Sequence, residues 1–354
     1  MADVGHVDGV DGSRLLANYL VVLLHAATAL QFVSRNMVEA SFWRMVCGSL
    51  CTLALPMLFF ISGYFMSVGY ERHGYSGLIR RRFRRLAVPY LVWNVIFILI
   101  YIGASFFGAL YANRVEKLGL LSLDGWLNVV NPLAQSIDGP LWYVRSVFIL
   151  AVFFPLADSL LRISKGFFAL FILIAWCVFS HFRDLEVVLQ LSFPAYALVT
   201  FFLGAWMHVH RVDIFKIVNR WSVSLGLVLV LIRYFSRLSE SPTYWLLRNI
   251  TWTFSFVVIL YLGRKVEGWS HRCSAANKVY NMLRECSFFV YASHIIICPI
   301  LSHTLARVVP LNSVGAPTVL VLGYFILGSA LCIGLYYLIG ARFASIRRIL
   351  NAEV

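Results

Sequence analysis

The chain has 354 residues, of which 60% are hydrophobic and only 13% are charged. Soluble globular domains carry about 25% charged residues, and a bilayer core needs about 20 consecutive apolar residues per helix. Apolar runs of that length, such as 86–110 and 319–339, exclude an ordinary soluble fold. The composition therefore predicts an all-α, polytopic membrane helix bundle that forms a single domain over residues 1–354.

About ten transmembrane helices are predicted from these runs. They are placed near residues 15–34, 43–68, 86–111, 141–160, 166–182, 190–209, 221–236, 246–263, 287–306 and 317–340. With a cytoplasmic N-terminus, the cytoplasmic segments hold about twenty of the 30 Lys and Arg residues. This positive-inside bias accounts for the net charge of +14 without a nucleic-acid partner and predicts that both termini are cytoplasmic. The acidic start of the chain, with Asp3, Asp8 and Asp11, leads us to expect that the first helix is not a cleaved signal peptide.

The first predicted helix, in SRLLANYLVVLLHA, carries two ionisable residues on one face. Arg14 and His25 are eleven residues apart, which is three helical turns and about 16 Å along the axis. Ionisable groups are costly in hydrocarbon and mark functional sites there, and histidine can take and return a proton near neutral pH. The alternative is an interfacial arginine and a hydrogen-bonded core histidine.

A basic run precedes the third predicted helix. It comprises Arg80, Arg81, Arg82, Arg84 and Arg85. Arginine forks match phosphate geometry, so the run suits the phosphates of a cytosolic donor. It equally suits lipid headgroups at the inner membrane surface.

Two predicted loops could lie on the membrane surface. The outer loop 112–140 holds an amphipathic stretch at 120–133, which either connects helices or covers a substrate cleft. The inner loop 263–287 is basic and is expected to rest on the anionic leaflet.

Two further helices carry polar side chains on one face. Trp142 and Arg145, in GPLWYVRS, are expected at the outer end of the fourth helix. Tyr291 and His294 lie in ECSFFVYASHI on the ninth. The alternatives are an aromatic-belt tryptophan and a core histidine. Asp158 is the one acidic residue well within a predicted helix, which counts against a proton-coupled transporter, and no metal-ligand cluster or phosphate-binding glycine loop occurs.

Five segments together resemble the acyltransferase-3 family of bacterial membrane acyltransferases, in the family's order along the chain. They are DGSRLLANYLVVLLHA, LPMLFFISGYFMS, RRRFRRLAVPYLVWN, GPLWYVRSVFIL and SFFVYASHIII. The resemblance implies that His25 is catalytic, as a general base or as a covalent carrier of the acyl group, and that Arg14 supports it. Some relatives carry an added esterase-like domain, which we do not expect here.

The resemblance also implies that an Arg-x-x-Arg pair binds the donor. Two registers fit, Arg81 with Arg84 or Arg82 with Arg85. We favour the second, because Arg85 then directly precedes the Leu-x-x-Pro-Tyr stretch.

The implied donor is a cytosolic acyl-CoA, most often acetyl-CoA, acting as a co-substrate with no permanently bound cofactor. The implied acceptor is a sugar hydroxyl on a lipid-linked or growing polysaccharide at the bacterial inner membrane. Trp142, Arg145, Tyr291 and His294 are expected on the acceptor side, among membrane lipids. A glycolipid transporter or flippase, and a non-catalytic subunit of a polysaccharide assembly complex, remain the alternatives.

Overall fold

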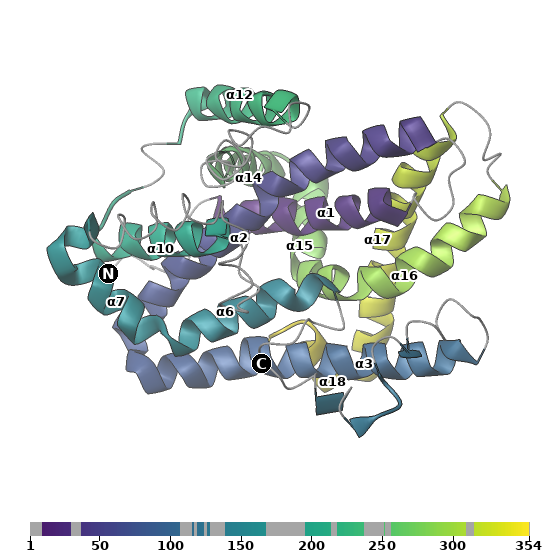
Figure 1. Ribbon diagram of the computed structural model, residues 1–354, viewed down its shortest axis with the longest axis horizontal. Coiled ribbons are helices and arrows are strands. Elements are labelled where there is room, and N and C mark those ends of the chain that lie inside the picture. Colours follow the sequence, from purple (N-terminus) through teal and green to yellow (C-terminus); the bar gives the residue numbers. More distant parts are fainter. Residues whose placement is uncertain are drawn as a thin grey trace.

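The computed structural model describes residues 9–29, 37–106, 115–116, 119–123, 126–127, 139–167, 195–213, 218–236, 251, 256–308 and 315–353. Across these residues the regular elements are all helices, which confirms the all-α prediction. Helices that run roughly along the long axis of the molecule in Figure 1 include α1 (Val10–Ala29), α3 (Val88–Ser105), α6 (Trp142–Val152) and α10 (Ala195–Val209).

The remaining long helices pack around these four. They are α2 (Met37–Arg82), α7 (Phe154–Arg162), α12 (Arg220–Ser236), α14 (Phe256–Ser270), α15 (Ser274–Glu285), α16 (Ser287–Val308) and α17 (Ala316–Arg342). The short elements are the π-helical turn η2 (Phe83–Ala87), the 3₁₀ turns η3 (Gly139–Leu141) and η4 (Ile163–Gly166), and α18 (Ala344–Leu350).

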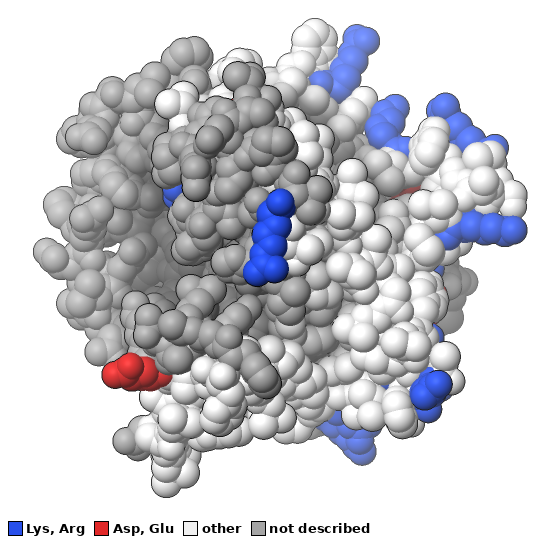
Figure 2. Space-filling view, turned by 90° about the vertical axis from the view of Figure 1, so that its right-hand side faces the viewer, with Lys and Arg blue, Asp and Glu red and all other residues white. Residues whose placement is uncertain are grey.

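Several helices are long and apolar enough to enter a membrane. The helical run Val38–Ser105 and α17 can each cross a bilayer, α6 and α7 do so only as a bent pair, and Ala197–Val209 and Ser287–Ile297 are shorter apolar helices. On the face in Figure 2, uncharged side chains dominate the described surface. The chain is therefore a membrane protein. The number of ten spans stays a prediction, because nearly all of 166–182 and part of 246–263 lie outside the described residues.

Three predicted boundaries were wrong. The helix expected at 141–160 is two helices that meet at Phe153 at an angle of 64°. Pro155, in the first turn of α7, cannot donate a backbone hydrogen bond and disfavours helix continuation before it. The second helix runs past residue 68 to Arg82, across a break at Gly74. The loop expected at 263–287 is mainly helical, because its apolar residues recur at helical spacing and bury Ala276 and Tyr280 on one face of α15.

Small residues let the central helices approach closely. A Cβ atom on Gly63 of α2 would lie 1.8 Å from the carbonyl oxygen of Phe201 in α10, and one on Gly204 would lie 2.1 Å from that of Phe60. At the start of α1, a Cβ on Gly12 would lie 2.3 Å from the carbonyl oxygen of Gly263 in α14. Such contacts between small residues are the usual way in which membrane helices associate. They fix α1 and α2, the two helices that carry most of the site.

The start of α1 is also fixed by a buried carboxylate. One oxygen of Glu267, in α14, accepts hydrogen bonds from the backbone N–H groups of Gly9 (3.1 Å) and Gly12 (3.2 Å). The first N–H groups of a helix have no partner within it and favour negative charge. This cap fixes the position of Arg14, two residues after Gly12.

Candidate active site

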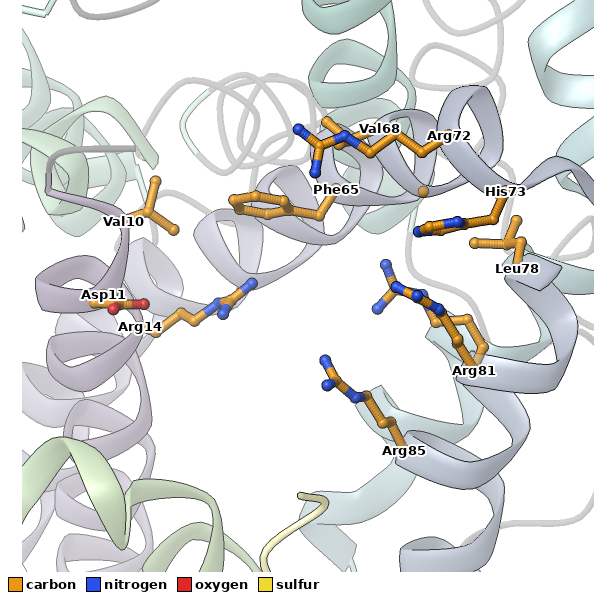
Figure 3. A pocket seen from close by; sticks show the side chains of 12 residues that line it. Val10, Asp11, Arg14, Phe65, Val68, Arg72, His73, Leu78, Arg81 and Arg85 are labelled. Carbon is orange, nitrogen blue, oxygen red and sulfur yellow. The ribbon is translucent and has the colours of Figure 1, made fainter. Parts of the chain in front are cut away.

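A pocket of about 290 Å³ lies at the end of the bundle where α1 begins. We call it the arginine pocket, and we call this end of the bundle the arginine end. The pocket is lined by Val10, Asp11, Arg14, Phe65, Val68, Gly69, Arg72, His73, Leu78, Arg81, Arg82 and Arg85. Figure 3 shows the side chains of Arg14, Arg72, Arg81 and Arg85 directed toward one shared space. The single carboxylate in the lining, that of Asp11, already pairs with Arg284 at 2.9 Å. The pocket is therefore strongly electropositive.

A turn in the backbone brings the arginines to this pocket. α2 is interrupted at Gly74, whose φ is 63°, and Figure 1 shows that the chain turns back and continues along α3. Glycine adopts this left-handed conformation without the steric cost of a Cβ atom. Residues 75–82 thus face the start of α1, where Arg14 lies over the ring of Phe65 at 5.2 Å. Guanidinium groups held this close repel one another unless an anion lies between them.

The pocket favours one of the two Arg-x-x-Arg registers. Arg82 and Arg85 both line it together with Arg14. Arg84 lines only a neighbouring hollow of about 580 Å³, which shares His73, Arg81 and Arg85 with the first pocket. The π-helical turn η2 follows Arg82 directly, a feature that is frequent at functional sites. Arg82 with Arg85 is therefore the register of which both arginines line the pocket together with Arg14.

Tyr143 joins the pocket to the interior of the bundle, and our sequence analysis missed it. Its hydroxyl donates to the Leu58 carbonyl at 3.1 Å and lies 2.6 Å from the hydroxyl of Ser62, which donates to it. The same side chain is close enough to Arg14 and Arg82 to interact with both charges. Its position between Trp142 and Arg145 in the chain was the available signal.

Two histidines meet farther along α1. The rings of His25 and His294, in α16, have centroids 5.1 Å apart and are tilted by 50°. Nδ1 of His294 lies 2.7 Å from the Tyr291 carbonyl oxygen and 3.2 Å from that of Val290, so Nδ1 carries the proton. Its Nε2 then holds a lone pair, is fully buried, and has no hydrogen-bond partner within the described part of the chain. A buried acceptor beside a second imidazole is suited to proton transfer.

Comparison with protein families agrees with this geometry. The model of the acyltransferase-3 family, described as an acyltransferase domain, matches residues 7–338. The chain belongs to the acyltransferase-3 family. Searches of curated proteins and of solved structures found no match to the chain. The resemblance inferred from the five segments is confirmed.

Two of the acyltransferase-3 segments are joined in space. The hydroxyl of Tyr291, in SFFVYASHIII, donates to the backbone carbonyl of Pro140, in GPLWYVRSVFIL. The Tyr-x-x-His segment thus fixes the turn η3 that begins α6. In a third segment, the glycine of ISGYF is Gly63, which allows the close approach of α10.

The structure packs Trp142 and Arg145 against other helices of the bundle. Trp142 packs against Phe59, in the middle of α2, with ring centroids 5.7 Å apart. Arg145 is 7% exposed, and Tyr90, near the start of α3, lies in its neighbourhood. The expected position of Trp142 and Arg145 toward the outer side of the membrane stays a prediction. The Nε and Nη1 atoms of Arg145 have no hydrogen-bond partner among the described residues.

Proposed function

We propose that this membrane acyltransferase moves an acyl group, in the simplest case acetyl, from cytosolic acyl-CoA to a sugar hydroxyl. The acceptor is a cell-envelope or exported polysaccharide, or its lipid-linked precursor. The observation that carries the proposal is the pocket lined by five arginines and a single, already paired carboxylate. Coenzyme A carries three phosphate groups, and arginine forks bind phosphate oxygens in pairs.

Helix α1 would align donor and catalyst. Arg14 lies in the arginine pocket, and His25 lies about 16 Å farther along the same unbroken helix. That distance is comparable to the length of the pantetheine arm of coenzyme A. With the phosphates on Arg14, Arg82 and Arg85, the thioester would reach the imidazole pair.

The chemistry then needs one base. His25 removes the proton of the acceptor hydroxyl as its oxygen attacks the thioester carbonyl. The carbon–sulfur bond breaks, and the thiolate takes the proton from His25. Nε2 of His294 makes no hydrogen bond among the described residues, so in the reaction a ring nitrogen of His25 would turn to donate to it. That bond would orient His25, as the third group does in a catalytic triad. His294 would then be a positioning residue, and the ring separation of 5.1 Å is compatible with such a bond.

This function fixes the orientation in the membrane. Acyl-CoA is made in the cytoplasm, so the arginine end would face the cytoplasm of a bacterial inner membrane, with both termini on that side. The excess of Lys and Arg in the predicted cytoplasmic segments supports the same orientation.

The test uses the purified protein with acetyl-CoA carrying a labelled acetyl group. Label transfer to an envelope glycan fraction, or slow thioester hydrolysis, is expected from the wild type. His25→Gln keeps polarity but removes the base, and should lower transfer by about 10²–10⁴-fold. His271→Gln, at an exposed turn after α14, is the matched control and should retain full activity. A wild type that turns over no acetyl-CoA, or a His25→Gln variant with near-normal transfer, would contradict the proposal.

A further inference from the structure

A second pocket, distinct from the arginine pocket, lies between α1 and α2 at the opposite end of the bundle. It has a volume of about 360 Å³ and is lined by Leu24, Thr28, Ser41, Arg44 and Met45. We call it the Arg44 pocket. None of the five acyltransferase-3 segments contains Ser41, Arg44 or Met45.

The Arg44 pocket lies beside the turn of α1 that carries His25, although neither histidine lines it. Leu24, in its lining, directly precedes His25, and Thr28 follows His25 by one helical turn, about 4.5 Å along the axis. The arginine pocket lies on the other side of His25, at Arg14. A molecule in the Arg44 pocket would therefore approach His25 from the side opposite to the acyl donor.

The pocket carries one uncompensated positive charge. Arg44 is exposed, lies in an apolar helix, and forms no ion pair with the described residues. The acidic residue nearest to it along α2 is Glu39, whose two carboxylate oxygens accept hydrogen bonds from the Gly315 N–H (3.1 Å) and the Thr318 hydroxyl (2.9 Å). Glu39 is therefore engaged at the start of α17. A cation in an apolar span is costly and marks a substrate pathway by default.

Hydroxyl groups accompany this charge. The hydroxyl of Thr28 donates to the Leu24 carbonyl at 2.9 Å, so its lone pairs remain available to accept from a ligand. Ser41 adds a second, exposed hydroxyl. One guanidinium, two hydroxyls and the apolar side chains of Leu24 and Met45 suit a sugar that carries an anionic group.

We infer that the Arg44 pocket binds the acceptor and that this acceptor carries an oxyanion, either a carboxylate or a phosphate. This inference rests on the proposed function, because it assigns the acceptor site of that reaction. The guanidinium of Arg44 binds the oxyanion, which is the geometry that an arginine fork favours. The hydroxyl to be acylated then lies toward His25.

The first experiment measures binding without requiring turnover. In a cysteine-free background, Thr28→Cys is labelled with a membrane-impermeant maleimide in proteoliposomes that expose this end. Three probes are added in turn: a hexuronate oligosaccharide, its neutral methyl ester, and a polyprenyl-diphosphate-linked sugar. At least one anionic probe should slow labelling, and the ester should not. The uronate and diphosphate arms show which oxyanion is bound. Protection should disappear in Arg44→Ala and partly return in Arg44→Lys.

The second experiment measures transfer. Arg44→Ala should raise the KM of the protecting acceptor about tenfold or more, the effect of losing one charge-assisted hydrogen bond. Arg307→Ala removes an exposed charge from the last turn of α16, at the same end of the bundle, and should leave this KM unchanged.

Three results would overturn the inference. They are a Thr28→Cys residue that the reagent does not reach, equal protection by the uronate and its ester, and protection by anionic lipid vesicles alone that matches the glycan probes. The last result would make Arg44 a lipid anchor. Failure of the proposed function is a separate result, because the wild type would then turn over no acetyl-CoA while the labelling data stand.

Discussion

The imidazole pair allows a test in which two substitutions each keep one nitrogen position of His294. In the wild type, Nδ1 of His294 lies 2.7 Å from the Tyr291 carbonyl oxygen. In His294→Asn, the amide nitrogen takes the place of Nδ1 and can still donate to this carbonyl, but no atom replaces Nε2. In His294→Gln, the amide oxygen reaches the place of Nε2 and can accept from His25, while the Nδ1 donor is lost. The first variant keeps the structural contact, and the second keeps the contact proposed for function.

The size of the effect separates the possible roles. One neutral hydrogen bond contributes about 0.5–1.5 kcal/mol, which is about 2- to 13-fold in rate. His294→Asn should therefore lower kcat about 2- to 13-fold with an unchanged melting temperature. A general base would cost about 10²–10⁴-fold instead. His294→Gln should recover most of kcat while unfolding at a lower temperature, because a buried bond to a backbone carbonyl is lost.

The assay follows the release of the coenzyme A thiol at saturating acceptor, beside the melting temperature in the same detergent. Wild-type kcat in His294→Asn would refute the positioning role. Equal losses of kcat in both variants would also refute it, because the positioning role predicts that Gln restores kcat. A purely structural histidine should instead be replaced better by Asn than by Gln. A loss above 10²-fold in His294→Asn would make His294 the base itself.

Three other predictions follow from the fold and the pocket. Arg85→Ala should raise the donor KM by about 10-fold or more, which corresponds to a loss of about 1.5–3 kcal/mol in binding free energy. Arg84→Ala should raise this KM less, because Arg84 lines the neighbouring hollow. Equal effects of the two substitutions would favour a lipid-binding role for the arginine run. Gly63→Ala should lower the melting temperature, because the new Cβ would clash with α10 at a cost of about 1–3 kcal/mol. Gly48→Ala should not lower it, because nothing lies within 4 Å of the new Cβ. Equal melting temperatures of the two variants would contradict the close approach of α10. In a cysteine-free background, Ser76→Cys should resist an impermeant reagent in intact cells, and labelling would invert the proposed topology.

The sequence predicted the positions of candidate site residues that depend on local spacing, and their roles stay predictions. Arg14 and His25 lie on one unbroken helix. This could be predicted because the helical period is visible in the sequence without information on the packing of other segments. The favoured register of Arg82 with Arg85 agrees with the pocket. The signals were an apolar helix with two polar positions and a five-arginine run, both read directly along the chain.

The sequence could not predict contacts between distant segments. His25 and His294 meet through the packing of α1 on α16, and no spacing rule relates positions so far apart. The contact of Trp142 with Phe59 also depends on tertiary structure, because the apolar pattern of α6 does not say which helix it packs against. Pro155 did give a local signal for the break after α6, which the length of the apolar run obscured.

The turn at Gly74 determines how the two walls of the arginine pocket meet. A Cβ atom at this position would meet nothing within 4 Å, so the glycine is required by its backbone conformation and not by crowding. Arg81 and Arg82 follow this turn within the same short helix, whereas Arg14 and Phe65, on the facing wall, precede it. The two walls of the pocket are therefore joined through one backbone conformation, and a side chain at Gly74 would strain that connection. The second wall is held in place by the buried side chain of Leu78 and by the hydrogen bond from the Tyr75 hydroxyl to the Val152 carbonyl. Substitution of Gly74 is therefore expected to disturb the arginine pocket without touching any residue that lines it.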